Sequence, residues 1–172
     1  MFAVKWVEGY LVNNQKIRYI HGDQILLDQI KLLWEELNEH HCQHSPNFKD
    51  HYNRMTFEKR KSDLLKKSLL GEMRVDLAVD ETSGCAVGYC VSSLIGEKIG
   101  EIESIFVNIE YRGLGIGDSL IKNALSWMDK EGATEKIVEV GDGNEQAFGF
   151  YARYGFLPRK TVLKQVKKAV ID

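Results

Sequence analysis

One short segment, residues 112–117, constrains this chain more than any other. It reads Arg-Gly-Leu-Gly-Ile-Gly, follows the apolar run 105–107 and precedes a helical pattern. Glycine adopts backbone angles that other residues resist and lets the backbone approach a ligand closely. The first N–H groups of a helix lack partners within the helix, and the helix dipole is positive at that end. A strand, a glycine-rich turn and a helix N-terminus in this order predict a phosphate site.

Three phosphate-binding motifs can be compared with this segment. A nucleoside-triphosphate loop requires Lys-Ser or Lys-Thr after its glycines, and neither pair follows here. A dinucleotide fingerprint requires G-x-G-x-x-G, but its last position would be Asp118 or Leu120. The third pattern, Arg/Gln-x-x-Gly-x-Gly/Ala, is matched by Arg112, Gly115 and Gly117. Only this third pattern agrees with the chain.

This third pattern is similar to the signature of the GCN5-related N-acetyltransferases (GNAT), in which the loop holds the pyrophosphate of coenzyme A. Residues 101–117 as a whole resemble the family's fourth strand and its pyrophosphate loop. Further along, the family's second signature is resembled by Asn144-x-x-Ala147-x-x-Phe150-Tyr151-x-x-x-Gly155-Phe156. Two signatures in the expected order are more specific than either one alone. The resemblance extends from about Asp76 to Val166.

The resemblance implies an α/β fold of the α+β type, with a mixed, mostly antiparallel sheet and helices on both faces. It also implies a splayed parallel central strand pair around the pantetheine arm. The length of 172 residues predicts one domain, a GNAT acetyltransferase domain over residues 1–172. Hydrophobic spacing predicts helices over 23–40, 56–70, 116–130 and 145–153, and strands over 75–79, 86–94, 101–107, 135–140 and 156–166, after short strands within 2–19.

Acetyl transfer needs an unprotonated amine, a polarised thioester carbonyl and a leaving thiolate. Glu101 and Glu103 share a strand face and are candidate bases. Spermidine/spermine-type members align their proposed base with Glu103, which we favour, and histone-type members with Glu101. Because a glutamate pKa is about 4.3 and an alkylammonium pKa about 10.4, burial must shift these values or water must relay the proton. Tyr151 matches the tyrosine that family members are thought to use as general acid.

The resemblance also implies acetyl-CoA as co-substrate and no metal. A backbone N–H near Val107 would polarise the carbonyl, and Asn144 would hydrogen-bond the pantetheine chain. Asp118 is expected to interact with the helix dipole while turned outward. The implied cofactor-binding residues are Ile105, Phe106, Val107, Arg112, Gly113, Leu114, Gly115, Ile116, Gly117, Asp118, Asn144 and Tyr151.

Composition and charge exclude several other classes of function. The net charge of −2 gives no case for nucleic acid, and without an apolar stretch of about 18 residues we expect no membrane span. The three cysteines have no zinc-type spacing and are expected to be reduced thiols of a cytoplasmic protein. His40, His41 and His44 do not form H-E-x-x-H, and we expect them to border the acceptor pocket rather than to bind metal.

The sequence thus predicts an N-acetyltransferase that moves an acetyl group from acetyl-CoA to a primary amine of a small molecule by direct attack in a ternary complex. A protein or peptide N-acetyltransferase and a non-catalytic acetyl-CoA-binding regulatory module are the alternatives. Glu35, Glu36 and Glu39 hint at a cationic acceptor, although a solvated acidic helix face explains them as well. Dimerisation is common in the family, so a homodimer is compatible with the resemblance.

Overall fold

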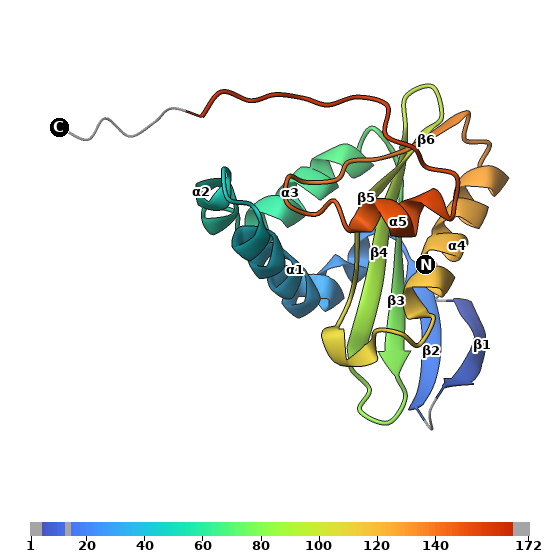
Figure 1. Cartoon of the computed structure of the whole chain (residues 1–172). Coiled ribbons are helices and arrows are strands. Elements are labelled where there is room, and N and C mark those ends of the chain that lie inside the picture. The colour runs from blue at the N-terminus through green and yellow to red at the C-terminus, as the bar shows by residue number, and fades with distance from the viewer. Residues whose placement is uncertain (1–4, 13–14, 167–172) are drawn as a thin grey trace. The chain divides into compact units, whose positions relative to one another are not determined.

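The computed structural model describes residues 5–12 and 15–166, which contain a six-stranded sheet. Its strands lie in chain order: β1 (Lys5–Val12), β2 (Gln15–Gly22), β3 (Gly71–Asp80), β4 (Ala86–Ile95), β5 (Ile99–Val107) and β6 (Glu135–Val138). Each pair of adjacent strands from β1 to β5 is antiparallel, whereas the pair of β5 and β6 is parallel (Figure 1). This mixed, mostly antiparallel sheet confirms the predicted fold class.

The chain separates into two compact units. Unit 1 combines Met1–Leu37 with Thr56–Glu139 and includes every strand of the sheet. Unit 2 combines Asn38–Met55 with Val140–Asp172. The single domain over residues 1–172 is not tested by this division and stays a prediction.

The helices of the structure are η1 (Gln24–Ile30), α1 (Lys31–His44), α2 (Lys49–Asn53), α3 (Phe57–Ser68), η2 (Ile109–Tyr111), α4 (Ile116–Lys130) and α5 (Ala147–Ala152). The bounds of α4 agree with the prediction. Thr56 caps α3 as its position suggests, because its Oγ1 accepts the N–H of Lys59 at 3.2 Å. The helix predicted over 23–40 is a 3₁₀ segment that continues into α1. No helix among the described residues is long and apolar enough to span a bilayer.

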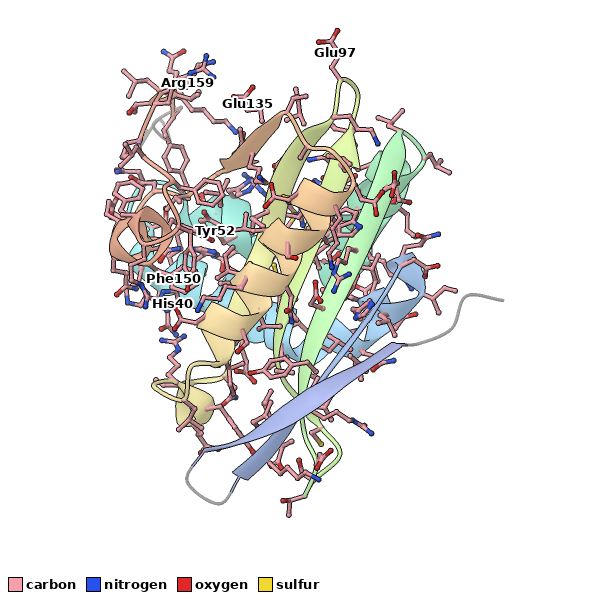
Figure 2. All side chains as sticks on the ribbon, turned by 90° about the vertical axis from the view of Figure 1, so that its right-hand side faces the viewer. His40, Tyr52, Glu97, Glu135, Phe150 and Arg159 are labelled. Carbon is pink, nitrogen blue, oxygen red and sulfur yellow. The ribbon has the colours of Figure 1, made fainter. Side chains whose placement is uncertain are left out.

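Unit 1 carries helices on both faces of the sheet, with α4 on one face and α3 on the other (Figure 1). On the face of the sheet that α4 covers, β4 and β5 each have a glycine beneath the helix. A Cβ at Gly88 would lie 3.3 Å from the side chains of Ile116 and Leu120, and one at Gly100 would lie 2.7 Å from Sδ of Met128. These glycines let α4 lie close against β4 and β5, as it crosses the sheet in Figure 2. The same figure shows Glu97 pointing away from the turn between β4 and β5.

The parallel pairing of β5 and β6 is short. It runs from Ile99 opposite Glu135 to Ile102 opposite Val138, where β6 ends. Residues 103–107 of β5 therefore continue without a β6 partner among the described residues. This early parting of the two strands agrees with the predicted splay.

The strand predicted over 156–166 is wrong. The structure assigns no strand to these residues, and the side chains of Leu157, Val162 and Leu163 are 78, 77 and 92% exposed. An apolar alternation becomes a strand only where a neighbouring edge accepts its hydrogen bonds, and Pro158 removes one donor. The sequence pattern shows the apolar alternation of a strand, but it does not show whether a neighbouring strand is present to pair with it.

Candidate active site

Glu101 and Glu103 lie on the same face of β5, as the alternation of side chains along a strand predicts. Both carboxylates meet side chains of α3, on the face opposite α4. Glu103 is also the extra residue of a bulge, because Ser92 of β4 pairs with Ile102 and Val91 pairs with Ser104. The predicted shared face is therefore confirmed.

Two cations of α3 hold these carboxylates. Lys67 Nζ donates to Oε2 of Glu101 at 2.5 Å and also to Oε1 of Glu103. Arg60 Nη2 donates to Oε2 of Glu103 at 3.2 Å. Ser93 Oγ adds a 2.6 Å hydrogen bond to Oε1 of Glu103. We call Arg60, Lys67, Glu101 and Glu103 the carboxylate cluster; its formal charges cancel.

The two carboxylates differ in access. The Glu103 side chain is 4% exposed and both of its oxygens accept hydrogen bonds, whereas Glu101 is 18% exposed and is held by Lys67. Burial by itself would lower the pKa of Lys67, but the hydrogen bonds from its ammonium to Glu101 and Glu103 raise that pKa above the ordinary value. Lys67 therefore stays protonated at neutral pH. Glu101 is the carboxylate with room for another partner.

The glycine-rich segment forms an open turn at the start of α4. Gly113 has a φ of +79° and Gly115, the N-cap, has a φ of +75°. Side chains resist such left-handed angles, so glycine is suited to both positions. A Cβ at either glycine would meet nothing within 4 Å, so the space beside the turn is open. An open turn beneath the free N–H groups of a helix fits a pyrophosphate.

Arg112 is anchored beside this turn by β5. Its Nε donates to the carbonyl oxygen of Val107 at 3.1 Å, and its guanidinium lies 5.6 Å from the ring centroid of Phe106. The side chain is thus held over the end of the strand while the residue as a whole stays exposed. Asp118 lies in the first turn of α4, where the positive end of the helix dipole stabilises a carboxylate.

The second signature lies in unit 2. Tyr151 of α5 is 9% exposed, and its ring packs edge-on against Phe150 and Phe156 at centroid distances of 5.3 and 5.9 Å. Asn144 is in the preceding turn, where its carbonyl oxygen accepts the N–H of Ala147 at 2.9 Å. The ring of Tyr151 is thus part of an aromatic core, as its helical spacing predicts. Roles of Tyr151 and Asn144 in binding or catalysis stay predictions.

Three histidines gather at the end of α1, also in unit 2. The rings of His40 and His44 are 4.2 Å apart, and the ring of His41 stacks on Tyr52 at 5.2 Å; Figure 2 labels His40 and Tyr52. We call His40, His41, His44 and Tyr52 the histidine cluster. Gln146 Nε2 lies 3.3 Å from Nε2 of His40. No group of three or more His, Cys, Asp or Glu residues in the described part of the chain is arranged to hold a metal ion.

Burial lowers the pKa of His41, and the neighbouring rings of His40 and His44 lower it further. The Nδ1 atom of His41 is buried and has no hydrogen-bond partner. Burial also raises the pKa of Tyr52, helped by the carboxylate of Asp142. His41 is therefore neutral at pH 7, and its position beside the 141–143 loop is the finding that sequence spacing could not predict.

The acidic side chains of α1 already have hydrogen-bond or ion-pair partners within the protein. Glu36 accepts a 3.0 Å hydrogen bond from the side chain of Asn108, Glu35 lies 4.0 Å from Lys31, and Glu39 accepts a 2.8 Å bond from Gln43. These contacts favour the interpretation of a solvated helix face over a binding site for a cationic acceptor. The free thiols predicted for Cys42, Cys85 and Cys90 are confirmed.

Sequence reasoning missed Arg60 and Lys67. Both lie in a lysine-rich helix that a pattern describes simply as a solvated face, and seven residues separate them, which is two helical turns. That spacing places them on one side of α3. The sequence does contain a hint of this contact: two cations lie on one side of a helix, and two glutamates lie on one face of an otherwise apolar strand, so the two pairs could have been expected to meet.

Together, the mixed sheet, the parting strands and the open glycine turn at the start of α4 define an α/β protein with a half-buried carboxylate pair on β5. The chain belongs to the acetyltransferase (GNAT) family, whose model matches residues 33–156.

Relatives and solved structures agree with this assignment. An uncharacterized N-acetyltransferase of Methanocaldococcus jannaschii is 37% identical over 101 residues, which cover 52% of this chain and 44% of that protein. A peptidyl-lysine N-acetyltransferase of Escherichia coli, YjaB, is 35% identical over 92 residues, or 54% of this chain and 55% of that protein. The chain thus spans about half the length of these curated relatives.

Among solved structures, the aminoglycoside N-acetyltransferase AAC(6')-Iy in complex with CoA is similar with a TM-score of 0.65. Its sequence identity is 16%, and the match covers 92% of this chain and 100% of that one. At this identity the likeness concerns the fold alone.

Proposed function

We propose that this chain transfers the acetyl group of acetyl-CoA to a primary amine of a small molecule, with both substrates bound at the same time. The observation that carries the proposal is the end of β5: a carboxylate pair on the strand, and an open turn with Gly113 and Gly115 directly after it. A CoA-bound aminoglycoside acetyltransferase has the same fold, so a small-molecule acceptor is compatible with this fold.

Residue roles follow from the contacts of the site. Glu101 is the carboxylate proposed to accept the amine proton, directly or through water, because both oxygens of Glu103 already accept hydrogen bonds. The neutral amine then attacks the thioester carbonyl carbon, which a backbone N–H near Val107 polarises. The carbon–sulfur bond breaks and Tyr151 gives its proton to the leaving thiolate, while the proton that the acetylated nitrogen loses returns through water to the Tyr151 oxygen. Glu103, which we favour from the sequence alone, instead orders Lys67 and Arg60.

The turn and the strand end supply the cofactor contacts. The N–H groups at the start of α4 suit the pyrophosphate, and Arg112 lies beside them. Residues 105–107 and Asn144 are proposed to hydrogen-bond the pantetheine chain. Holding both reactants in one geometry can supply about 7–11 kcal/mol of the barrier reduction, so binding residues matter as much as the base.

A peptide or protein acceptor is the second candidate. It is favoured by the peptidyl-lysine N-acetyltransferase of Escherichia coli, which is 35% identical to part of this chain. A lysine side chain presents the same primary amine as a small molecule, so the chemistry at Glu101 would be unchanged. The two candidate functions differ in the rest of the acceptor molecule, which is a small molecule in one case and a polypeptide in the other.

Release of coenzyme A thiol measured across aminoglycosides, polyamines, amino acids and lysine peptides tests the proposal. We expect turnover with at least one small amine, and a lower kcat with unchanged coenzyme A affinity in Tyr151→Phe. Tyr154→Phe is the matched control on the same segment. Turnover with peptides alone would favour the second candidate. Silence with every amine, despite coenzyme A binding, would indicate a non-catalytic binding module.

A further inference from the structure

Arg60 connects α3 to the main chain of β5 as well as to a side chain. Its Nη2 donates to the carbonyl oxygen of Glu103 at 2.9 Å and to Oε2 of the same residue at 3.2 Å. The Arg60 side chain is 24% exposed, so most of it is removed from water. One guanidinium group therefore holds both the backbone and the carboxylate of one residue.

Within the described part of the chain, Glu103 itself has no regular strand partner on either side, although residues 104–107 after it pair again with β4. Toward β4 it is the extra residue of the bulge, and toward β6 the parallel pairing has ended at Ile102. A bulge leaves the extra residue outside the ladder, and a buried carbonyl without a donor costs about as much as a lost hydrogen bond. Arg60 supplies that donor from outside the sheet.

The balance of charges in the cluster concerns the carboxylates and does not explain the bond from Arg60 to the carbonyl oxygen of Glu103. Lys67 already bridges the carboxylates of Glu101 and Glu103, and Ser93 donates to Glu103 as well. What Arg60 alone provides is the bond to the carbonyl oxygen. Arginine is suited to it, since its planar group presents several donors in a fixed arrangement whereas an ammonium is a single point of charge.

We infer that Arg60 is a positioning residue for acetyl-CoA: by fixing the carbonyl of Glu103 it sets the course of residues 103–107. This inference rests on the proposed function, which places the pantetheine arm along that part of β5. Among the described strands, residues 104–107 pair with β4 alone, and the bulge at Glu103 interrupts that ladder, so the course of this strand end depends on how Glu103 is held. A looser strand end must be ordered when the arm binds, and that ordering reduces affinity and misaligns the thioester.

The test compares Arg60→Met and Arg60→Lys with wild-type protein. Amide hydrogen exchange is followed in peptides covering 103–107 and, as an internal reference, 75–79 of β3, which does not pair with β5. Calorimetry gives the dissociation constant of coenzyme A, and thiol release gives kcat. In Arg60→Met we expect at least tenfold faster exchange in 103–107 with 75–79 unchanged, about tenfold weaker coenzyme A binding, and a kcat about 10- to 100-fold lower. Arg60→Lys should recover only part of each loss.

Lys61→Met is the matched control, because Lys61 is the next residue of α3 and pairs with the exposed carboxylate of Asp28 at 2.6 Å. It should behave as wild type in all three measurements. Unchanged exchange in 103–107 of Arg60→Met, or full recovery in Arg60→Lys, would overturn the inference. If Arg60→Met does not fold, the same criteria apply to Arg60→Gln. The exchange and affinity measurements need no acceptor, so a wild-type protein that acetylates no amine would refute the proposed function separately.

Discussion

The carboxylate cluster of unit 1 and the histidine cluster of unit 2 both remove polar side chains from water, and they do so by different means. In the first, Lys67 and Arg60 form ion pairs with the carboxylates of Glu101 and Glu103. In the second, His41 gives up its charge, since burial lowers its pKa and its Nδ1 has no partner. One cluster is stabilised by ion pairs and the other by being neutral.

This difference decides what disrupts each cluster. A buried ion pair gains little over an apolar pair, but removal of one partner leaves an uncompensated charge and is costly. A neutral buried imidazole costs little at pH 7 and becomes unfavourable only when acid protonates it. The carboxylate cluster should therefore respond most to substitution and the histidine cluster most to pH.

The largest expected effect separates the two carboxylates. If Glu101 is the base, Glu101→Gln should lower kcat about 10²- to 10⁴-fold, the range typical of general base catalysis. Glu103→Gln keeps the shape of the side chain but replaces one accepting oxygen with an NH₂ group, and it should lower kcat less than Glu101→Gln does. Steady-state kinetics from pH 6 to 9 measure both variants. A larger loss in Glu103→Gln would return the role of base to Glu103.

The next effect concerns the loop that closes the histidine cluster. A Cβ at Gly143, where φ is +84°, would lie 1.9 Å from the carbonyl oxygen of His44. Gly143→Ala combines a strained backbone with a clash and should destabilise the protein by about 3 kcal/mol. Gly113→Ala is the control, since it has a similar φ but open space, and should cost about 1 kcal/mol. Urea unfolding measures both; equal losses would mean that the loop is not closed against α1.

Removal of the bridging ammonium comes third. Lys67→Met leaves two carboxylates with Arg60 alone and should destabilise by about 2 kcal/mol, less than for a fully buried pair because Lys67 is 22% exposed. Lys66→Met removes an ion pair of a 73% exposed side chain and should change stability by less than about 0.5 kcal/mol. Urea unfolding at pH 7 compares them. Equal stability of the two variants would contradict a buried role for the cluster.

The smallest expected effect is a pH dependence. Because the pKa of His41 is lowered below its ordinary 6.5, the unfolded chain binds a proton more readily than the folded protein. Stability is thus fully present above pH 6.5 and decreases as the pH falls below it. His41→Gln should flatten this decrease between pH 6.5 and 5, whereas His51→Gln, at an exposed position, should not. An unchanged slope in His41→Gln would assign the acid sensitivity to other groups.

The parts of the fold that local sequence encodes were predictable. Thr56 caps α3, the apolar stripe of α4 sets its bounds at Ile116–Lys130, and two glycines give the turn before it its left-handed angles. These features depend on propensities and spacing within a few residues. The predicted face shared by Glu101 and Glu103 belongs here too, because side chains two residues apart in a strand lie on one face.

Other features needed segments that are distant in the chain. The strand predicted over 156–166 failed because no pattern within a segment states which edge will accept its hydrogen bonds. Lys67 lies 34 residues from Glu101, and Arg60 lies 43 residues from Glu103. Whether a lysine on a charged helix is solvated or buried depends on what packs against it.

The sequence by itself therefore determined the family signature and the glycine-rich turn before α4, because each is written in neighbouring positions. Only the tertiary structure decided how deeply each carboxylate is buried, since that depends on how α3 packs against β5. Burying a charge without a partner is costly, which is the physical reason that Glu103, at 4% exposed, is paired on both oxygens while Glu101 stays 18% exposed.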